Sequence, residues 1–178
     1  STLVLDVLEA HGLEALWHVP DRRSEGYGLN IPAIEELAAQ GCGILLTVDC
    51  GISDMAAVAR ARELGMTVVI SDHHLPPPEL PPADAICNPR LGPEDDMPCP
   101  HLAGVGVAFF LMAAVNAALA PHTGRRFKMD KVLDLVALGT LADVMRLGGQ
   151  NRILVRGGLD KLAEAARPGI AALKTVSG

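Results

Sequence analysis

Short apolar runs alternate with longer amphipathic segments through the first half of the chain. The runs at 44–48 and 68–70 are rich in Val, Ile and Leu, and polar residues follow each of them. Such runs predict buried strands of a parallel sheet. Residues 54–64 lie between them and carry a helical pattern that stops at Gly65. We therefore expect a βαβ unit whose right-handed crossover places both strand ends at one edge of the sheet.

Three further elements are predicted before this unit. Residues 3–8 have a helical pattern, and Gly12 stands where a C-cap glycine would lie. The apolar residues at 16–19 predict a short strand that Pro20 ends. A second helix is expected from a proline at its first turn to a closing glycine, over 32–41.

The second half of the chain is predicted to be mainly helical. A strand is expected within 83–87, and helical patterns then cover three ranges: 105–120, 129–138 and 151–166. The fold class is thus α/β, with a parallel, Rossmann-like sheet flanked by helices. We expect one domain over 1–178, with an α/β part over about 1–103 and a mainly helical part over about 104–178.

Polar residues that can bind a metal follow both strands of the βαβ unit. The second strand ends on Asp72, His73 and His74, and the first ends on Asp49. Ligands bind at the carboxyl ends of strands in open α/β sheets. An isolated acid such as Asp49 would more commonly cap the following helix. Burying all four groups together without a metal or mutual pairing is costly, so the cluster predicts a metal site.

A third acid lies further along the chain. Asp143 is embedded in the otherwise apolar segment 139–144. Charged residues with apolar neighbours on both sides usually have a partner, and a metal ion is one such partner. We therefore add Asp143 to the candidate ligands.

Composition narrows the class of protein. Apolar residues make up 49% of the chain and aromatic residues only 3%, which suits a helix-covered parallel sheet built from Ala, Val, Leu and Ile. The formal net charge of −6 argues against binding nucleic acid by bulk attraction alone, but a local basic groove is compatible with it. No signal peptide is recognised, and no apolar run approaches the length of a membrane span, so we expect a soluble protein with no membrane partner.

The four cysteines are expected to be reduced. They form no Cys-x-x-Cys pair and match no zinc-finger spacing. Free thiols of this kind are typical of a cytoplasmic protein, and we expect most of them to be buried.

Two polar loops and a glycine pair have alternative interpretations. The loop 21–28 contains Arg22 and Tyr27, which suits contact with an anion or a ring, although a solvated turn has the same composition. Gly104 and Gly106 resemble a phosphate-binding turn only weakly, because no strand leads into them. Close helix packing is the favoured interpretation of both glycines.

These motifs, in this order, resemble the DHH phosphoesterase superfamily, which is named for its Asp-His-His motif. The matching segments are 48–51, 71–74, 87–90, 104–109, 139–144 and 151–152. Together they span most of the chain. The segment Glu-Gly-Tyr-Gly-Leu at 25–29 favours the bacterial single-strand exonucleases of this superfamily.

The resemblance implies a two-metal phosphodiesterase that uses Mn²⁺ or Mg²⁺. By position, Asp49 resembles the carboxylate that bridges the two ions, and His73 and Asp143 resemble further metal ligands. His74 resembles the imidazole that contacts the scissile phosphate, and Asp72 would orient its neighbours.

The implied activity is 5′ to 3′ degradation of single-stranded DNA in repair and recombination, by a protein expected to be a monomer. Candidate substrate-binding residues are Arg22, Tyr27, Asn88, Arg90, Gly104 and Arg152. Two alternatives are left open: a relative that cleaves small nucleotides or oligoribonucleotides, and a DHH-like scaffold without catalysis.

One motif of the family is not found in the sequence. In the family, two aspartates separated by one residue end a strand just before a segment like residues 1–4. We therefore expect that these ligands lie upstream and that this chain is a fragment of a catalytic core. Such a fragment should bind divalent metal weakly or in one position, and should degrade little DNA.

Overall fold

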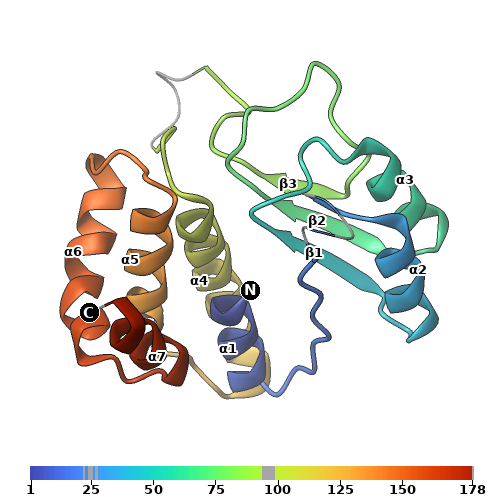
Figure 1. The fold of residues 1–178 in the computed structure, drawn as a ribbon. Helices are drawn as coiled ribbons and strands as arrows, with labels where there is room; N and C mark the ends of the chain where they lie inside the picture. Colours follow the sequence, from blue (N-terminus) through green and yellow to red (C-terminus); the bar gives the residue numbers. More distant parts are fainter. Residues whose placement is uncertain (22, 24–25, 27, 94–98, 178) are drawn as a thin grey trace.

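A parallel sheet forms the centre of the first half of the molecule (Figure 1). The computed structural model describes residues 1–178 except 22, 24–25, 27, 94–98 and 178. Within these residues the sheet has the order β1-β2-β3, with bounds Ile44–Val48, Thr67–Ser71 and Ala85–Cys87. Helix α3, Met55–Glu63, connects β1 to β2, and Val48 lies opposite Ser71. The predicted parallel βαβ unit is confirmed.

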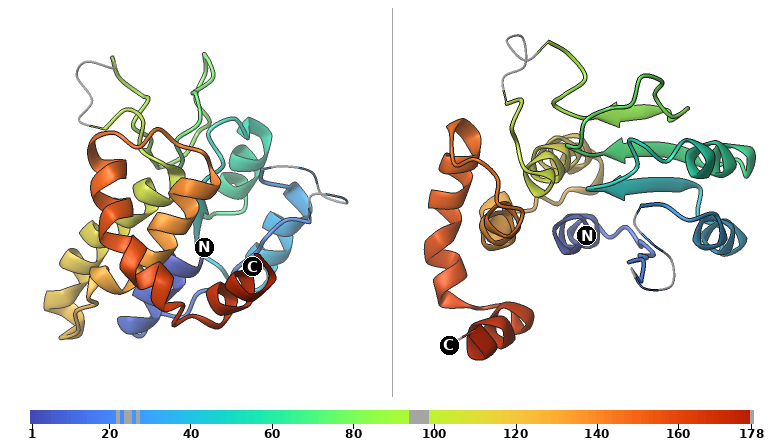
Figure 2. Two further views of the ribbon diagram at one scale, coloured as in Figure 1. Left: turned by 60° about the vertical axis from the view of Figure 1, so that its left-hand side comes forward. Right: turned by 45° about the horizontal axis from the view of Figure 1, so that its top comes forward.

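The sheet is covered on both faces, as the apolar strand pattern requires. Helices α2, Ile31–Ala39, and α3 cover one face, where Leu45, Val68 and Ile70 are buried with Val58. Leu46 belongs to the opposite face and packs into the core formed by the other helices. Alternate residues of one strand thus enter two different cores, which is the period-two geometry of a strand. Figure 2 shows the sheet between these two groups of helices.

The remaining helices pack together on the second face. Helix α1 lies beside α4, and α5 lies between α4 and α6 (Figure 1). Their bounds are α1 Thr2–Ala10, α4 Gly104–Thr123, the 3₁₀ helix η2 Met129–Val132, α5 Leu133–Ala142, α6 Gly149–Glu164 and α7 Pro168–Ser177. Their shared core contains Val7, Met112 and Val136. The sequence patterns predicted each of these helices except α7.

The short strand predicted at 16–19 is wrong. These residues form no strand, and the structure leaves Trp17 67% and Val19 61% exposed. A strand needs a neighbouring strand to satisfy its backbone groups. In the described part of the chain the sheet consists of β1, β2 and β3, and residues 16–19 are not paired with the open edge of β1.

Helix α4 corrects another expectation. Its 20 residues contain no Asp, Glu, Lys or Arg and are long and apolar enough to cross a membrane, so the expectation that no apolar run reaches this length is wrong. However, one face of α4 packs against α1, α5, β1 and β2, and 33% of its apolar window is buried in the structure. A core helix passes the same test of length and composition as a membrane span.

All four cysteines are free, as expected, but none is fully buried. Each has intermediate exposure, including Cys87 at the end of β3 and Cys50 after β1. The expectation of mostly buried thiols is therefore wrong in degree.

Candidate metal centre

The chain leaves β1 through a residue with left-handed backbone geometry. Asp49 has a φ of 67°, and its amide still donates to the carbonyl of Ser71 at 2.8 Å. Left-handed geometry at a residue other than glycine is uncommon, and Asp tolerates it better than most. Asp49 does not cap α3, whose N-cap is Asp54. The sharp turn directs the Asp49 side chain toward the end of β2.

Asp49 and Asp143 meet at the same imidazole nitrogen. Nε2 of His73 lies 3.2 Å from Oδ1 of Asp49 and 3.4 Å from Oδ2 of Asp143. The His73 side chain is only 7% exposed, whereas the two acids are about half exposed, at 50% and 45%. The hydrogen bond with Asp49 raises the pKa of His73, against the opposing effect of burial. The three residues form a polar cluster that is buried at its base and open to solvent at its carboxylates.

The Asp72 side chain holds the residues at the end of β2 by hydrogen bonds. Its buried carboxylate accepts hydrogen bonds from the amides of His73 at 2.7 Å and Ile52 at 3.1 Å. It also lies 2.6 Å from Nδ1 of His74. Burial raises the pKa of Asp72, but these hydrogen bonds outweigh burial and the pKa is lowered below its ordinary value. A charged Asp72 therefore fixes the orientation of the His74 ring through Nδ1.

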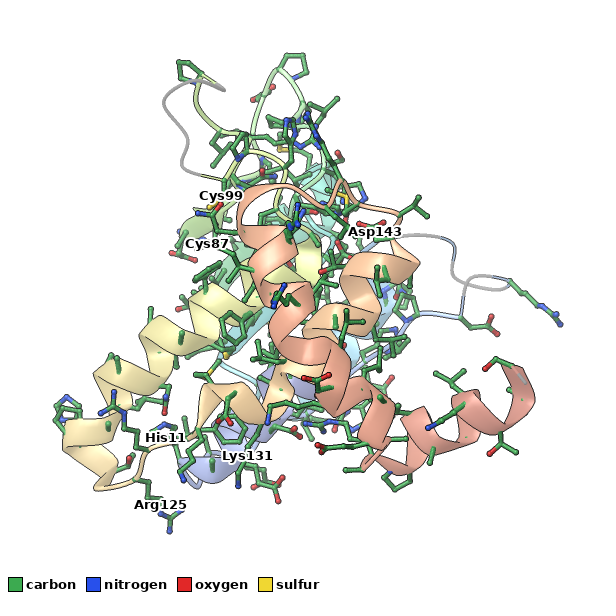
Figure 3. All side chains as sticks on the ribbon, turned by 90° about the vertical axis from the view of Figure 1, so that its left-hand side faces the viewer. His11, Cys87, Cys99, Arg125, Lys131 and Asp143 are labelled. Carbon is green, nitrogen blue, oxygen red and sulfur yellow. The ribbon has the colours of Figure 1, made fainter. Side chains whose placement is uncertain are left out.

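Asp143 is placed by the end of a helix. It is the C-cap of α5, and the next residue, Val144, has a φ of 54°. The Val144 amide donates to the carbonyl of Leu141 at 3.1 Å, and the Met145 amide donates to the carbonyl of Thr140 at 3.2 Å. These two bonds form a Schellman motif, in which the left-handed position is usually glycine. Figure 3 shows Asp143 at this end of the helices, far from His11.

Gly104 lies against the Asp49 carboxylate. A Cβ added at Gly104 would clash with Oδ1 of Asp49, whereas one added at Gly106 would meet Leu102. The expectation of helix packing thus fails for Gly104. Since Gly104 begins α4, the positive end of that helix dipole lies beside Asp49.

The other predicted substrate-binding residues differ in their surroundings. Asn88 is buried, donates to the His74 carbonyl at 2.9 Å and accepts from the Arg90 amide at 2.8 Å, so its side chain supports the loop. Nε of Arg90 is buried and has no hydrogen-bond partner among the described residues. Arg152 is exposed on α6, and Arg22 and Tyr27 lie outside the described residues.

Sequence reasoning missed the role of Asn151. The motif drew attention to its neighbour Arg152, but Asn151 is the buried member of the pair, with 2% exposure. Its amide hydrogen bonds to three backbone groups. An asparagine at an inward-facing position of an amphipathic helix was the available signal.

The donor atoms of this cluster suit a hard or borderline divalent cation. Ligand atoms of Asp49, His73 and His74 all lie within 4.8 Å of one another. Asp143 adds a second carboxylate, 3.4 Å from Nε2 of His73. Carboxylate oxygens with imidazole nitrogens are ligands that Mn²⁺ accepts, and carboxylates also suit Mg²⁺. The residues present therefore fit a metal centre.

Comparisons with known proteins show which exonucleases this chain is similar to. The chain is 48% identical over 166 residues to the single-stranded-DNA-specific exonuclease RecJ of Haemophilus influenzae, covering 89% of this chain and 28% of the relative. It is 45% identical to RecJ of Escherichia coli over 184 residues, covering 99% of this chain and 31% of the relative. The chain thus spans less than a third of these relatives.

Solved structures show the same fold. An exonuclease RecJ bound to manganese superposes with a TM-score of 0.84 at 34% identity, over 99% of this chain and 44% of the other. RecJ of Thermus thermophilus in complex with Mn²⁺ gives 0.77 at 31% identity, over 99% of this chain and 24% of the other. The N-terminal domain of the DHH family matches residues 1–140. With its Asp-His-His motif at the end of β2, the chain belongs to the DHH family.

Proposed function

We propose that this chain is the metal-binding part of an exonuclease that degrades single-stranded DNA from the 5′ end. The observation that carries the proposal is the convergence of Asp49 and Asp143 on Nε2 of His73, at 3.2 and 3.4 Å. The chain is similar to proteins named single-stranded-DNA-specific exonucleases, and it resembles manganese-bound structures of them.

In this proposal, some residues of the site bind metal and others contact the phosphate. Asp49, His73 and Asp143 would hold Mn²⁺ or Mg²⁺, which when bound supplies an activated water and polarises the phosphate. His74, held by Asp72 through Nδ1, presents Nε2 toward the reacting phosphate oxygens. Because Nδ1 is bound to Asp72, Nε2 is the ring nitrogen that would contact the phosphate.

A second metal requires more ligands than this cluster supplies. One edge of β1 has no strand partner in the described residues, and Ile44 on this strand is 69% exposed. A groove of about 1240 Å³ adjoins it, lined by Leu16, Trp17, Val48 and Asp49 among others. Open edges and apolar flanks favour the addition of a strand. We propose that a strand carrying the Asp-x-Asp motif fills this groove in the whole protein and completes the two-metal site.

The residues encoded just upstream of Ser1 test the second metal site. An Asp-x-Asp at the end of an apolar run there supports it, and the absence of paired acids would remove it.

Cleavage by the whole protein tests the substrate. We expect a long 5′-labelled single strand to be degraded faster than a dinucleotide in the presence of Mn²⁺. A long strand can make more phosphate contacts with a binding groove than a dinucleotide can, and each contact adds to its affinity. Asp143→Ala should abolish both reactions. Preference for the dinucleotide would favour the small-nucleotide alternative, and an inactive whole protein would favour a scaffold.

A further inference from the structure

One buried side chain joins the two segments that position the acids of the candidate metal centre. Oδ1 of Asn151 accepts a hydrogen bond from the Ala103 amide at 3.1 Å. Its Nδ2 donates to the carbonyl of His101 at 2.7 Å and to that of Arg146 at 3.1 Å. Asn151 lies in the first turn of α6 and is 2% exposed.

The first of these segments sets the position of Asp49. Ala103 is the N-cap of α4, and its own side chain makes no capping hydrogen bond. The next residue, Gly104, is in direct contact with the Asp49 carboxylate. A movement of the Ala103 amide would therefore move the surface on which this carboxylate rests.

The second segment sets the position of Asp143. Arg146 follows Asp143 by three residues and the left-handed Val144 by two, and the Met145 amide between them donates to the Thr140 carbonyl. A β-branched residue in left-handed geometry costs free energy, so other contacts must hold this turn in place. The hydrogen bond from Asn151 to the Arg146 carbonyl is such a contact.

An asparagine amide is matched to this task. It carries two N–H donors and an acceptor oxygen, and here both donors and the acceptor are used. An aspartate of the same size would place carboxylate oxygen against two carbonyl oxygens. Aspartate has no N–H to donate, so the hydrogen bonds to the His101 and Arg146 carbonyls would be lost.

We propose that Asn151 is a positioning residue that fixes Asp49 relative to Asp143 and thereby sets the metal affinity of the centre. The proposal rests on the metal-dependent function proposed above. In this proposal Asn151, the buried member of the Asn151-Arg152 motif, acts through the backbone and does not contact the substrate.

The structure offers a matched control on the same group of helices. Asn116 is also buried, at 5% exposure, and its amide donates to Phe127 at 3.0 Å and accepts from Phe127 at 2.9 Å. It also lies 2.8 Å from His11. Figure 3 shows His11 at the end of the helices opposite to Asp143. Asn116→Asp therefore disturbs a buried network of similar kind without touching the metal segments.

The test compares Mn²⁺ binding by the wild type, Asn151→Asp and Asn116→Asp, measured from the electron paramagnetic resonance signal of free Mn²⁺. We expect Asn151→Asp to weaken binding about 10-fold or more, and Asn116→Asp to change it by less than about twofold. Circular dichroism confirms that each variant is folded. If Asn151→Asp does not fold, Asn151→Ser replaces it, since its hydroxyl keeps one donor and one acceptor. Equal effects at 151 and 116, or no effect at 151, would overturn the proposal.

Amide hydrogen exchange separates this proposal from the proposed function. If the wild type binds no Mn²⁺, the proposed metal-dependent function is wrong. The positioning role of Asn151 can still be tested by amide hydrogen exchange of the metal-free protein. We then expect the amides of Ala103 and Met145 to exchange about 10-fold faster in Asn151→Asp than in Asn116→Asp. Equal exchange at these two amides would remove Asn151 from its positioning role.

Discussion

The carboxylate of Asp49 packs against the backbone of Gly104, so that the first residue of α4 forms part of the wall of the candidate metal centre. Only a residue without a side chain leaves room for this contact. The sequence offered the glycine but gave no indication of the acid beside it, because the two lie 55 residues apart in the chain, from position 49 to position 104.

Gly104→Ala should therefore weaken metal binding without unfolding the helix. Its Cβ would clash with Oδ1 of Asp49, while alanine favours a helix by about 0.5–1 kcal/mol over glycine. We expect Mn²⁺ affinity to fall about 10-fold, as when a ligand loses its support. Gly106→Ala is the control, since its Cβ would meet the Leu102 side chain, with Cδ1 at 2.8 Å and Cγ at 2.9 Å, and not Asp49. Equal Mn²⁺ affinity in the two variants would show that the wall does not constrain Asp49.

Val144→Gly should stabilise the chain. Val144 has a φ of 54° and is 88% exposed, so glycine relieves the left-handed strain and removes little buried surface. We expect the free energy of unfolding in urea to rise by about 1 kcal/mol. Val144→Ala, which keeps a Cβ but is not branched, should give a smaller gain. Destabilisation by glycine would mean that the valine side chain makes a contact that outweighs the strain.

The packing of α5 on α6 depends on Gly158. A Cβ added there would clash with the Leu133 carbonyl and lie 2.8 Å from the Cβ of Ala137. We expect Gly158→Ala to lower the free energy of unfolding by about 2–3 kcal/mol, as overpacking does. Its neighbour is the control: a Cβ at Gly157 would lie 3.4 Å from the end of the Leu133 side chain. Gly157→Ala should be neutral or slightly stabilising, and similar losses at both positions would refute this account of the helix contact.

The start of β2 should weaken in acid. Asp84 accepts a hydrogen bond from the Val68 amide at 2.7 Å and pairs with Arg62, and the two interactions lower the pKa of Asp84 below its ordinary 3.8. A lowered pKa in the folded state adds stability that is present above pH 3.8 and is lost as the pH falls through the lowered value. The free energy of unfolding, measured in urea across this pH range, should depend less steeply on pH in Asp84→Asn than in the wild type. An equal slope of unfolding free energy against pH in the variant and the wild type would show that Asp84 does not cause the loss of stability in acid.

Local patterns were sufficient for the strand-end part of the site. The runs before Asp49 and Asp72 predicted two parallel strands, and parallel pairing by itself brings their ends together. The location of Asp143 could not be predicted in this way. It depends on where α5 stops, and the left-handed residue that ends this helix is a valine and not the glycine that usually gives the signal.

Two other errors have related causes. The apolar residues 16–19 have strand composition, but strand formation depends on a partner that local pattern does not reveal. Asn151 was read as part of a motif around Arg152, because burial and backbone hydrogen bonds are properties of the packed structure. Both were errors about tertiary context, which outweighed local propensity.

The central claim is that Asp49, His73 and Asp143 form one metal centre. Calorimetric titration of the chain with Mn²⁺ tests it most directly, with Asp49→Asn and Asp143→Asn measured beside the wild type. We predict weak binding at a single position in the wild type, reduced about 10-fold or more in each variant because a charged ligand is lost. Binding that is equally strong in the wild type and both variants would contradict the assignment.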